Sequence, residues 1–373
     1  MASLWGWRLD PAVRIAAPLW LASKATVITL AWAASWIMRP GSNSGAPLAS
    51  AWEHWDASLL RHIAQYGYSA PQGSPDKNLV AFFPGYPLLL RLVHVIIPSW
   101  VGAEIAIASI ASFFAILGLV RLAEDYRAGS GANAALFFIV APAAVFLSVG
   151  YTEPLFLAFA LPSWLAARRG SWATASFLAT AACSVRVNGL FLLAGLLLIA
   201  LCRRARRRRS ALAYLAIPVL PVVAYELYLR FATGDWLAWQ HAEAAGWGRA
   251  LKNPVTTFKA TWTAAFGHEF HAPVAFMFQL ELGAAAVLLA TTIILAINRR
   301  WPEFVYCSLT VAALMAGTWY ESVPRALMLA WPLWCGLGSL ALRYKKAGFI
   351  WLGVSAPLMC VTALLYASGN WAA

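Results

Sequence analysis

A small set of ionisable residues stands beside long apolar segments and has the side-chain types needed for group transfer. Asp56 lies among aromatic residues in AWEHWDASLLRHIAQYGYS, Glu153 in SVGYTEPLF, Arg186 in SVRVNGL and Arg325 in ESVPRALML. A carboxylate can remove a proton from a hydroxyl group, and arginines can hold a phosphate as it gains negative charge. The sequence therefore predicts an acid–base and anion-binding site, with Asp56 as the candidate base.

Each of these residues also has a structural interpretation, which the sequence leaves open. Asp56 stands at the start of a predicted helix and could cap it. Glu153 could be a first-turn carboxylate favoured by the helix dipole. Arg186 needs an anion, which is either a protein carboxylate or a ligand phosphate. Arg325 has Glu321 four residues before it as a local partner.

Four further residues close to these in sequence are candidates for substrate or phosphate binding: His54, Arg61, Tyr151 and Asn188. Alternatively, His54 is an exposed surface histidine, and the same interpretation applies to His62. The five cysteines lie in apolar segments without metal-ligand spacing, and the chain has no Walker loop or dinucleotide-binding glycine pattern. We therefore expect no cofactor, with a divalent metal held by Asp56, Glu153 and Asp235 as the alternative.

Membrane helices must position these residues, because the composition is that of a polytopic membrane protein. Of the 373 residues 61% are hydrophobic and 12% charged, whereas a soluble domain carries about 25% charged residues. A helix needs roughly 20 apolar residues to cross the hydrocarbon. We expect a single all-α domain over residues 1–373, a bundle of about eleven helices at residues 15–38, 100–121, 133–150, 152–167, 171–185, 188–202, 211–231, 273–297, 301–319, 323–341 and 347–367.

The longest loop of this arrangement, residues 39–99, contains two predicted interfacial elements. A helical stripe of apolar residues runs through Trp52, Trp55, Leu59, Ile63 and Tyr66, which is typical of a helix lying along the membrane surface. The segment at residues 81–98 is apolar but interrupted by prolines, so it predicts an interfacial or re-entrant element.

The basic residues gather in the loops on one side of the bundle, and the largest group is a run of arginines within residues 203–209. Because Lys and Arg are retained in the cytoplasm, we expect the N terminus inside and the long loop 39–99 outside. The candidate site residues then fall at the extracytoplasmic ends of the helices. We interpret the arginine run as a cytoplasmic stop between two helices, with an anionic-lipid or nucleic-acid patch as the alternative, and we expect no nucleic-acid partner.

The blocks WEHWDASLLRHIAQYGY and AFFPGYPLLLR resemble the N-terminal signature of the PIG-V family, which contains the second mannosyltransferase of glycosylphosphatidylinositol anchor synthesis, and of its bacterial relatives. The later blocks SVGYTEPLF, SVRVNGL, TGDWLAWQ with WGRALKNP, and ESVPRALMLAWPLW are similar to further blocks of that family in the same order, over residues 52–335. The chain departs from the family pattern at His54, where arginine is frequent, and at Pro154, where a small residue is frequent.

The resemblance implies an integral-membrane glycosyltransferase of the GT-C type. Its fold would be a helix bundle whose first extracytoplasmic loop bears interfacial helices. Its donor would be a polyprenyl-phosphate-linked sugar, typically mannose, transferred with inversion, and Asp56 would be the base. Its acceptor would be a lipid, a glycan or a protein, and its location the plasma (inner) membrane of a bacterium with the active site on the extracytoplasmic face.

A transporter or flippase of a lipid-linked sugar is the alternative from a different class. Such proteins typically contain internal repeats and place charged residues near the middle of the membrane. The sequence has no internal repeat, and its candidate residues gather at one end of the predicted bundle. Both features favour an enzyme.

Overall fold

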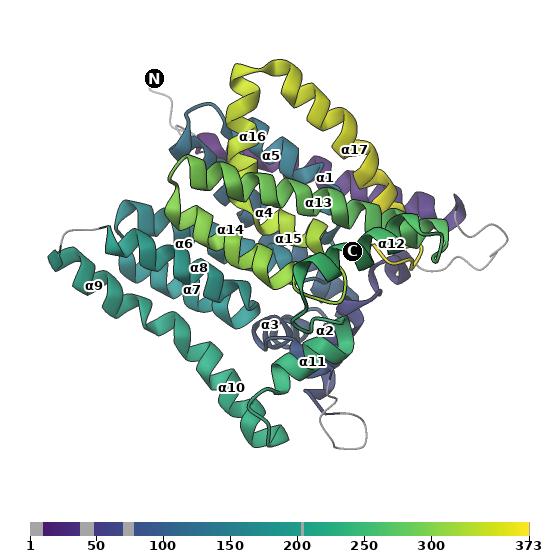
Figure 1. The fold of residues 1–373 in the computed structure, drawn as a ribbon, viewed down its shortest axis with the longest axis horizontal. Coiled ribbons are helices and arrows are strands. Elements are labelled where there is room, and N and C mark those ends of the chain that lie inside the picture. The colour runs from purple at the N-terminus through teal and green to yellow at the C-terminus, as the bar shows by residue number, and fades with distance from the viewer. Residues whose placement is uncertain (1–9, 38–47, 70–77, 203–204, 373) are drawn as a thin grey trace, which may run out of the picture.

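The computed structural model describes residues 10–37, 48–69, 78–202 and 205–372, and these residues fold into helices without a β-strand (Figure 1). The predicted all-α fold is confirmed. In chain order the α-helices are α1 (Pro11–Ile37), α2 (Asp56–Tyr66), α3 (Gly85–His94), α4 (Trp100–Tyr126), α5 (Gly131–Ile139), α6 (Glu153–Arg169), α7 (Trp172–Val185), α8 (Asn188–Leu201), α9 (Ala205–Leu215), α10 (Leu220–Thr233), α11 (Ala238–Trp247), α12 (Pro254–Phe266), α13 (Ala272–Ile297), α14 (Trp301–Leu314), α15 (Val323–Leu329), α16 (Trp331–Arg343) and α17 (Lys345–Ala367). Four short 3-10 turns lie between them: η1 (Leu48–Trp52), η2 (Leu79–Ala81), η3 (Ala144–Leu147) and η4 (Ile217–Val219).

Five helical segments of the described residues are long and apolar enough to cross a membrane, which makes this a multi-pass membrane protein. They are α1, α4, α13, α17 and the stretch Arg208–Thr233 formed by α9 and α10. The pair α15 and α16 would be a sixth span, bent by 71° between its two helices. The helices expected at residues 171–185 and 188–202 are present as α7 and α8, but with 14 residues each they are too short to cross the hydrocarbon alone.

One expected span is interrupted by a proline. Residues 133–150 were expected as a single helix, but α5 ends at Ile139 and the chain continues through Pro142 into η3. Proline lacks the backbone N–H of a helical residue and disfavours helix in the residue before it. In the short segment that follows the break, the side chains of Ser148 and Tyr151 are buried.

Helices of the loop regions gather at one end of the bundle. In Figure 1, α2, α3 and α11 lie together below α12 and the C terminus, and α16 and α17 lie at the top of the view. The helices α9 and α10 run along the lower left of the view. The α3 helix begins at Gly85 directly against α7, where a Cβ on Gly85 would lie 2.5 Å from the carbonyl oxygen of Ser184. The short helix α3 at residues 85–94 agrees with the expectation that this apolar segment is not a full span.

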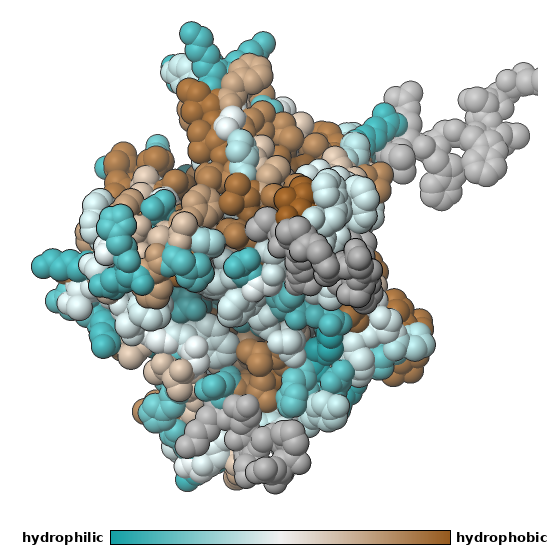
Figure 2. All heavy atoms as spheres, turned by 90° about the vertical axis from the view of Figure 1, so that its right-hand side faces the viewer, coloured by the Kyte–Doolittle hydropathy of each residue, from teal (hydrophilic) through white to brown (hydrophobic). Residues whose placement is uncertain are grey.

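The surface at the α12 end is divided by polarity. Figure 2 shows that hydrophobic residues dominate the upper part of this face, whereas the middle and lower parts mix hydrophilic and weakly polar residues with smaller hydrophobic patches. Large apolar side chains also point outward from the long helices, including Ile294 and Ile297 of α13 and Phe349 and Ile350 of α17. A helix that is apolar on its outer side is suited to contact with lipid tails.

Candidate active site

The helix α2 begins at Asp56, and the residue before it has an unusual backbone. Trp55 has a φ of 55°, a region that bulky residues rarely occupy. The N-cap residue of α2 is thus Trp55, which makes no side-chain capping hydrogen bond, and Asp56 is the first residue of the helix. Strained backbone of this kind persists where surrounding contacts fix it, and it concentrates at functional sites.

The apolar stripe expected along this segment is only partly correct. Trp52 lies in η1, outside α2, and is buried, as is Ile63. Trp55 and Tyr66 are 47% and 67% exposed. A single stripe requires one continuous helix from residue 52, but α2 begins only at Asp56, after the turn at Trp55. The residues before and after this turn therefore do not share one helical face.

Segments distant in sequence hold the start of α2 in place. The indole of Trp52 donates to the carbonyl of Ser148 at 3.0 Å, and the indole of Trp55 donates to the carbonyl of Asn370 at 3.2 Å. The ring of His54 packs edge-on against Tyr366 of α17. These contacts fix Asp56 from two sides, since Ser148 precedes α6 and Asn370 follows α17.

A second strained turn precedes Arg325. Ser322 has a φ of 65°, and α15 begins at the next residue. Both carboxylate oxygens of Glu281, which is fully buried in α13, accept from the first amides: Ser322 N–H at 2.9 Å and Val323 N–H at 2.8 Å. A carboxylate is well placed there, because the N-terminal amides of a helix lack partners within it. Glu281 therefore fixes the position of the helix that carries Arg325.

Arg325 connects two carboxylates from separate helices. One terminal nitrogen, Nη1, lies 2.9 Å from Oδ2 of Asp56, while Nε and Nη2 lie 3.0 and 2.8 Å from Oε1 of Glu153. The expected local pair with Glu321 does not form in the described structure. Glu321 lies before the start of α15, so the spacing rule that joins residues four apart in a helix does not apply to it.

Arg186 completes the cluster from the turn between α7 and α8. Its Nη1 lies 2.8 Å from Oε1 of Glu153 and also donates to the hydroxyl of Thr152. Its Nε lies 3.3 Å from Oδ1 of Asn188. The side chain of Glu153 is completely buried, whereas that of Arg186 is 20% exposed. Arg186 thus has a carboxylate partner and still faces open space, so both interpretations of its charge remain compatible with its position.

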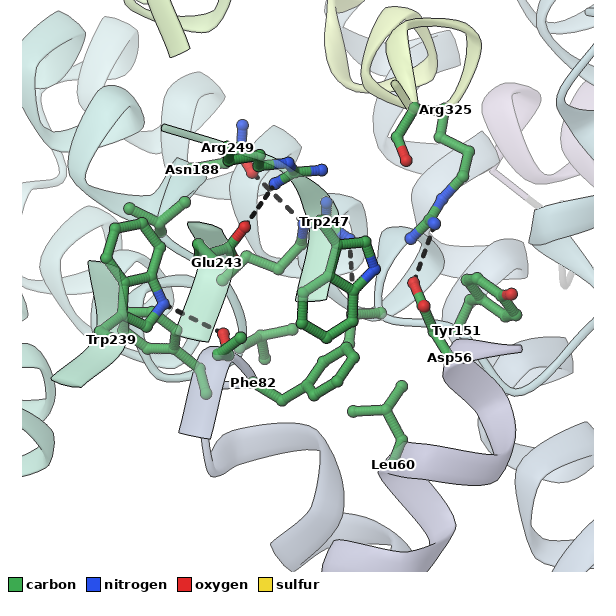
Figure 3. A pocket seen from close by; sticks show the side chains of 17 residues that line it. Asp56, Leu60, Phe82, Tyr151, Asn188, Trp239, Glu243, Trp247, Arg249 and Arg325 are labelled. Atoms are coloured by element: carbon green, nitrogen blue, oxygen red, sulfur yellow. Dashed lines mark hydrogen bonds and ion pairs between the residues drawn. The ribbon is translucent and has the colours of Figure 1, made fainter. Parts of the chain in front are cut away.

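The cluster forms one wall of a cavity of about 640 Å³, a volume that includes the space at its mouth. Asp56, Tyr151, Arg186, Asn188 and Arg325 all line it. The guanidinium of Arg325 lies over the ring of Tyr151, 4.6 Å from its centroid, and this contact keeps the cation against the wall. Figure 3 shows Asp56 and Arg325 meeting at one side of the cavity.

Three of the sequence candidates lie outside this cavity lining: Glu153, which is completely buried, Arg61 and His54. Arg61 makes two hydrogen bonds to the buried carboxylate of Glu104, at 2.7 and 2.9 Å, and pairs with Glu53 at 3.0 Å. It joins α2 to α4. His54 lies on the opposite side of the turn at Trp55, against α17. Neither residue is among those that line the cavity.

The other side of the cavity comes from residues that sequence reasoning did not select. The segment at residues 234–253 supplies Trp239, Trp247, Glu243 and Arg249, and Phe82 follows η2. Nη1 of Arg249 lies 3.1 Å from Oε2 of Glu243, and burial raises the pKa of the Glu243 carboxyl above its usual range. In the sequence this segment was noted only for the blocks TGDWLAWQ and WGRALKNP, which resemble the PIG-V family. Its charged residues did not stand out, because polar residues are ordinary in a loop.

Asp235, which the metal alternative required, does not approach the cluster. Its carboxylate accepts from the amide of Leu237 at 2.8 Å and pairs with His241 at 2.7 Å on the exposed side of α11. Within the part of the chain that the structure describes, no three His, Cys, Asp or Glu side chains are grouped as metal ligands.

Comparison with known proteins agrees with the resemblance found in the sequence motifs. Residues 45–215 match the family described as "Mannosyltransferase (PIG-V)". That region contains Asp56, Glu153 and Arg186, whereas Arg325 and the segment with Glu243 lie beyond it.

Individual relatives match over a similar region. The rat protein "GPI alpha-1,6-mannosyltransferase 2" is 35% identical over 163 residues, which is 40% of this chain and 31% of the relative. The human protein of the same name is 33% identical over 149 residues, 37% of this chain and 29% of the relative. "GPI mannosyltransferase 2" of Yarrowia lipolytica is 34% identical over 88 residues, 23% of this chain and 25% of the relative. The chain thus spans about a third, or less, of the length of the curated relatives it matches.

Proposed function

We propose that this chain, whose residues 45–215 resemble the PIG-V mannosyltransferases, transfers a hexose from a polyprenyl-phosphate donor to a hydroxyl acceptor with inversion. Mannose is the hexose that the names of the relatives suggest. The acceptor is a lipid, a glycan or a protein that presents a free hydroxyl group.

In this proposal Asp56 is the general base. It removes the proton from the acceptor hydroxyl as the oxygen attacks the anomeric carbon of the donor sugar. The bond between that carbon and the phosphate oxygen breaks, and the electron pair leaves with polyprenyl phosphate. Arg186 and Arg325 stabilise the negative charge that gathers on the leaving phosphate. Attack from the side opposite the phosphate inverts the anomeric centre.

The observation that carries the proposal is the joining of Asp56 and Arg325 at the wall of a cavity. The side chain of Asp56 is 14% exposed, so it is reachable from the cavity while being fixed by its ion pair. Glu153 lies behind the two arginines and balances part of their charge. A base and two cations on one wall suit a reaction that moves a proton and releases a phosphate, which favours an enzyme over a transporter.

The proposed location of this site is the extracytoplasmic face of the plasma membrane. The helix α6 begins with Glu153 and ends with Arg168 and Arg169, so its 17 residues place the site and these two arginines about 25 Å apart. Arg300, at the start of α14, lines a second cavity together with Arg168 and Arg169. Basic residues are retained on the cytoplasmic side, so the other end of α6 faces outward.

The direct test is incubation of the purified full-length chain with a panel of polyprenyl-phosphate sugars and a membrane extract, followed by mass spectrometry of the lipids, glycans and proteins. We expect a hexose to be added to an acceptor from polyprenyl-phosphate mannose, with formation of polyprenyl phosphate. Transfer from a soluble nucleotide sugar instead, without any use of the lipid donors, would contradict the proposal.

A further inference from the structure

We infer that Trp247, Glu243 and Arg249 form a binding site for a pyranose ring at the side of the cavity opposite Asp56. This inference rests on the proposed function and adds to it the part of the site that recognises sugar. Figure 3 shows Trp247 between the pair Asp56 and Arg325 on one side and the pair Glu243 and Arg249 on the other. The cavity is therefore polar at two places, with an aromatic surface between them.

The aromatic surface has the composition of a carbohydrate platform. Trp247 packs edge-on against Phe82, with ring centroids 5.2 Å apart. Trp239 lines the same cavity, and its indole donates to the carbonyl of Ala81 at 3.0 Å. The C–H face of a sugar is apolar and packs against aromatic rings, and ligand sites typically combine such rings with a few polar groups.

The ion pair between Glu243 and Arg249 supplies the polar groups. The side chains are 13% and 31% exposed, so the pair is shielded from bulk water but open to the cavity. A carboxylate accepts hydrogen bonds and a guanidinium donates them, and together they match the neighbouring hydroxyl groups of a sugar. The pair offers an acceptor and donors side by side, which suits the hydroxyl groups of an uncharged ring. At the other end, Arg186 and Arg325 are the cations that a phosphate would contact.

The backbone around Arg249 is fixed before any ligand binds. Gly248 ends α11 with a φ of 60°, a conformation that favours glycine. Its carbonyl accepts from the amide and the hydroxyl of Thr318, each at 2.9 Å, and the amide of Lys252 donates to the carbonyl of Ala316 at 2.7 Å. The loop is thereby joined to the connection between α14 and α15, which leads to Arg325. A fixed loop loses less entropy on binding.

Glu243 and Asp56 line the same cavity. Burial raises the pKa of the Glu243 carboxyl, and the charge of Asp56 raises it further, whereas Arg249 and Arg186 lower it. A sugar ring seated on Trp247 thus lies between the base and the hydroxyl-binding pair. Both a donor hexose and a saccharide acceptor present this ring.

Binding measurements test the inference without requiring turnover. The full-length chain in lipid nanodiscs, together with the variants Glu243→Gln and Trp247→Ala, is titrated with polyprenyl-phosphate mannose, with polyprenyl phosphate and with methyl α-mannoside. For a donor sugar, we expect each variant to lose about tenfold or more in affinity for the mannose-bearing lipid and to keep its affinity for polyprenyl phosphate. If the site holds the sugar of the acceptor instead, each variant should lose affinity for methyl α-mannoside only.

The matched controls are Glu269→Gln and Trp236→Ala, two exposed residues of the same region that do not line the cavity. Both should bind all three ligands like the unmodified chain. Retained binding of polyprenyl phosphate shows that a variant is folded. Three results would overturn the inference. The variants Glu243→Gln and Trp247→Ala could bind all ligands with affinities within twofold of the unmodified chain, or their affinity for polyprenyl phosphate could fall as much as that for the mannose-bearing lipid. The unmodified chain could also bind polyprenyl-phosphate mannose no more tightly than polyprenyl phosphate and show no binding of methyl α-mannoside. A chain that binds the sugar but transfers none would contradict only the proposed function.

Discussion

Glu153 is the residue on which the charge balance of the site depends. Its Oε1 accepts from both Arg186 and Arg325, and its side chain is completely buried. Together with Asp56, it gives the cluster two negative and two positive charges. Buried charges are tolerated when they are paired, and removing one partner leaves the other at high cost. Glu153 is therefore structural as well as electrostatic, because it holds the two proposed phosphate-binding cations.

We expect Glu153→Gln to destabilise the protein by about 3 kcal/mol, because the buried Arg325 and the partly exposed Arg186 would lose their shared carboxylate. The measurement is the midpoint of thermal unfolding in detergent. The control Glu53→Gln removes a carboxylate that is 42% exposed and pairs with Arg61, and it should change the midpoint little. Equal midpoints for the two variants would contradict the role assigned to Glu153.

At the scale of residues, the sequence singled out five of the residues that line the cavity, namely Asp56, Tyr151, Arg186, Asn188 and Arg325. Asp56, Glu153, Arg186 and Arg325 were predicted because charged residues beside apolar segments are costly and need a partner or a ligand. The pairing of Arg325 was not predictable, because its partners come from α2 and α6 and only the folded structure brings them near. Glu243 and Arg249 gave no comparable signal, since their segment is a polar loop.

The short helix α15 is the element that positions Arg325. It is only seven residues long, too short to be stable alone. Glu281 of α13 accepts from its first two free amides, and the 71° bend to α16 sets its direction. The start of α15 is therefore fixed by a side chain from another helix, and Ser322 provides the turn.

We expect Glu281→Gln to weaken this connection, since an amide offers one acceptor oxygen where the carboxylate offers two. Leaving one buried amide unsatisfied costs about 1–3 kcal/mol. Mannose transfer should fall together with the unfolding midpoint, because Arg325 moves with α15. Glu269→Gln, on an exposed loop, is the matched control. A Glu281→Gln protein with unaltered stability and activity would show that α15 is positioned by other contacts.

Close packing of α3 against α7 gives a separate prediction. A Cβ on Gly85 would lie 2.5 Å from both the carbonyl and the hydroxyl oxygen of Ser184. Gly85→Ala should therefore destabilise the protein by about 1–3 kcal/mol. Gly353→Ala in α17, where nothing lies within 4 Å of the new methyl group, should be neutral or stabilising. Comparison of the two unfolding midpoints tests this packing, and similar midpoints would contradict it.

At the scale of elements, apolar length predicted where helices lie better than where they end. The expected segments at residues 100–121, 171–185, 188–202 and 273–297 coincide closely with α4, α7, α8 and α13. Local chemistry decided the exceptions. Pro142 interrupts the segment after α5, and the positive φ of Trp55 divides the segment expected as one helix.

The whole molecule has two chemically different ends. The end with α2, α11 and the start of α15 carries the cluster of balanced charges, whereas Arg168, Arg169 and Arg300 gather at the opposite end of α6. By the positive-inside rule we expect the end with Arg168, Arg169 and Arg300 to lie in the cytoplasm. This distribution was visible in the sequence because it depends on counting charges, which requires no knowledge of tertiary contacts.

Thiol labelling tests the orientation. Cys202 is exposed at the basic end, where it lines the second cavity together with Arg168 and Arg300. Cys183, Cys307 and Cys335 are buried. A membrane-impermeant maleimide should label Cys202 in inside-out vesicles and not in right-side-out vesicles. The variant Gln240→Cys in a Cys202→Ser background, on the exposed side of α11, should label only in right-side-out vesicles. The reverse pattern would contradict an extracytoplasmic site.

The measurement that tests the central claim most directly is the rate of mannose transfer by Asp56→Asn. Asparagine keeps the size of the side chain but cannot accept the proton, so we expect transfer from labelled polyprenyl-phosphate mannose to fall by about 10²- to 10⁴-fold. Binding of the donor should be retained. The control is Asp10→Asn. Asp10 precedes α1, and its exposed carboxylate pairs with Arg121 of α4. This variant should transfer mannose at the rate of the unmodified protein. A transfer rate for Asp56→Asn within about threefold of that of the unmodified protein would contradict the assignment of Asp56 as the base, because the loss of a positioned base lowers the rate far more than this.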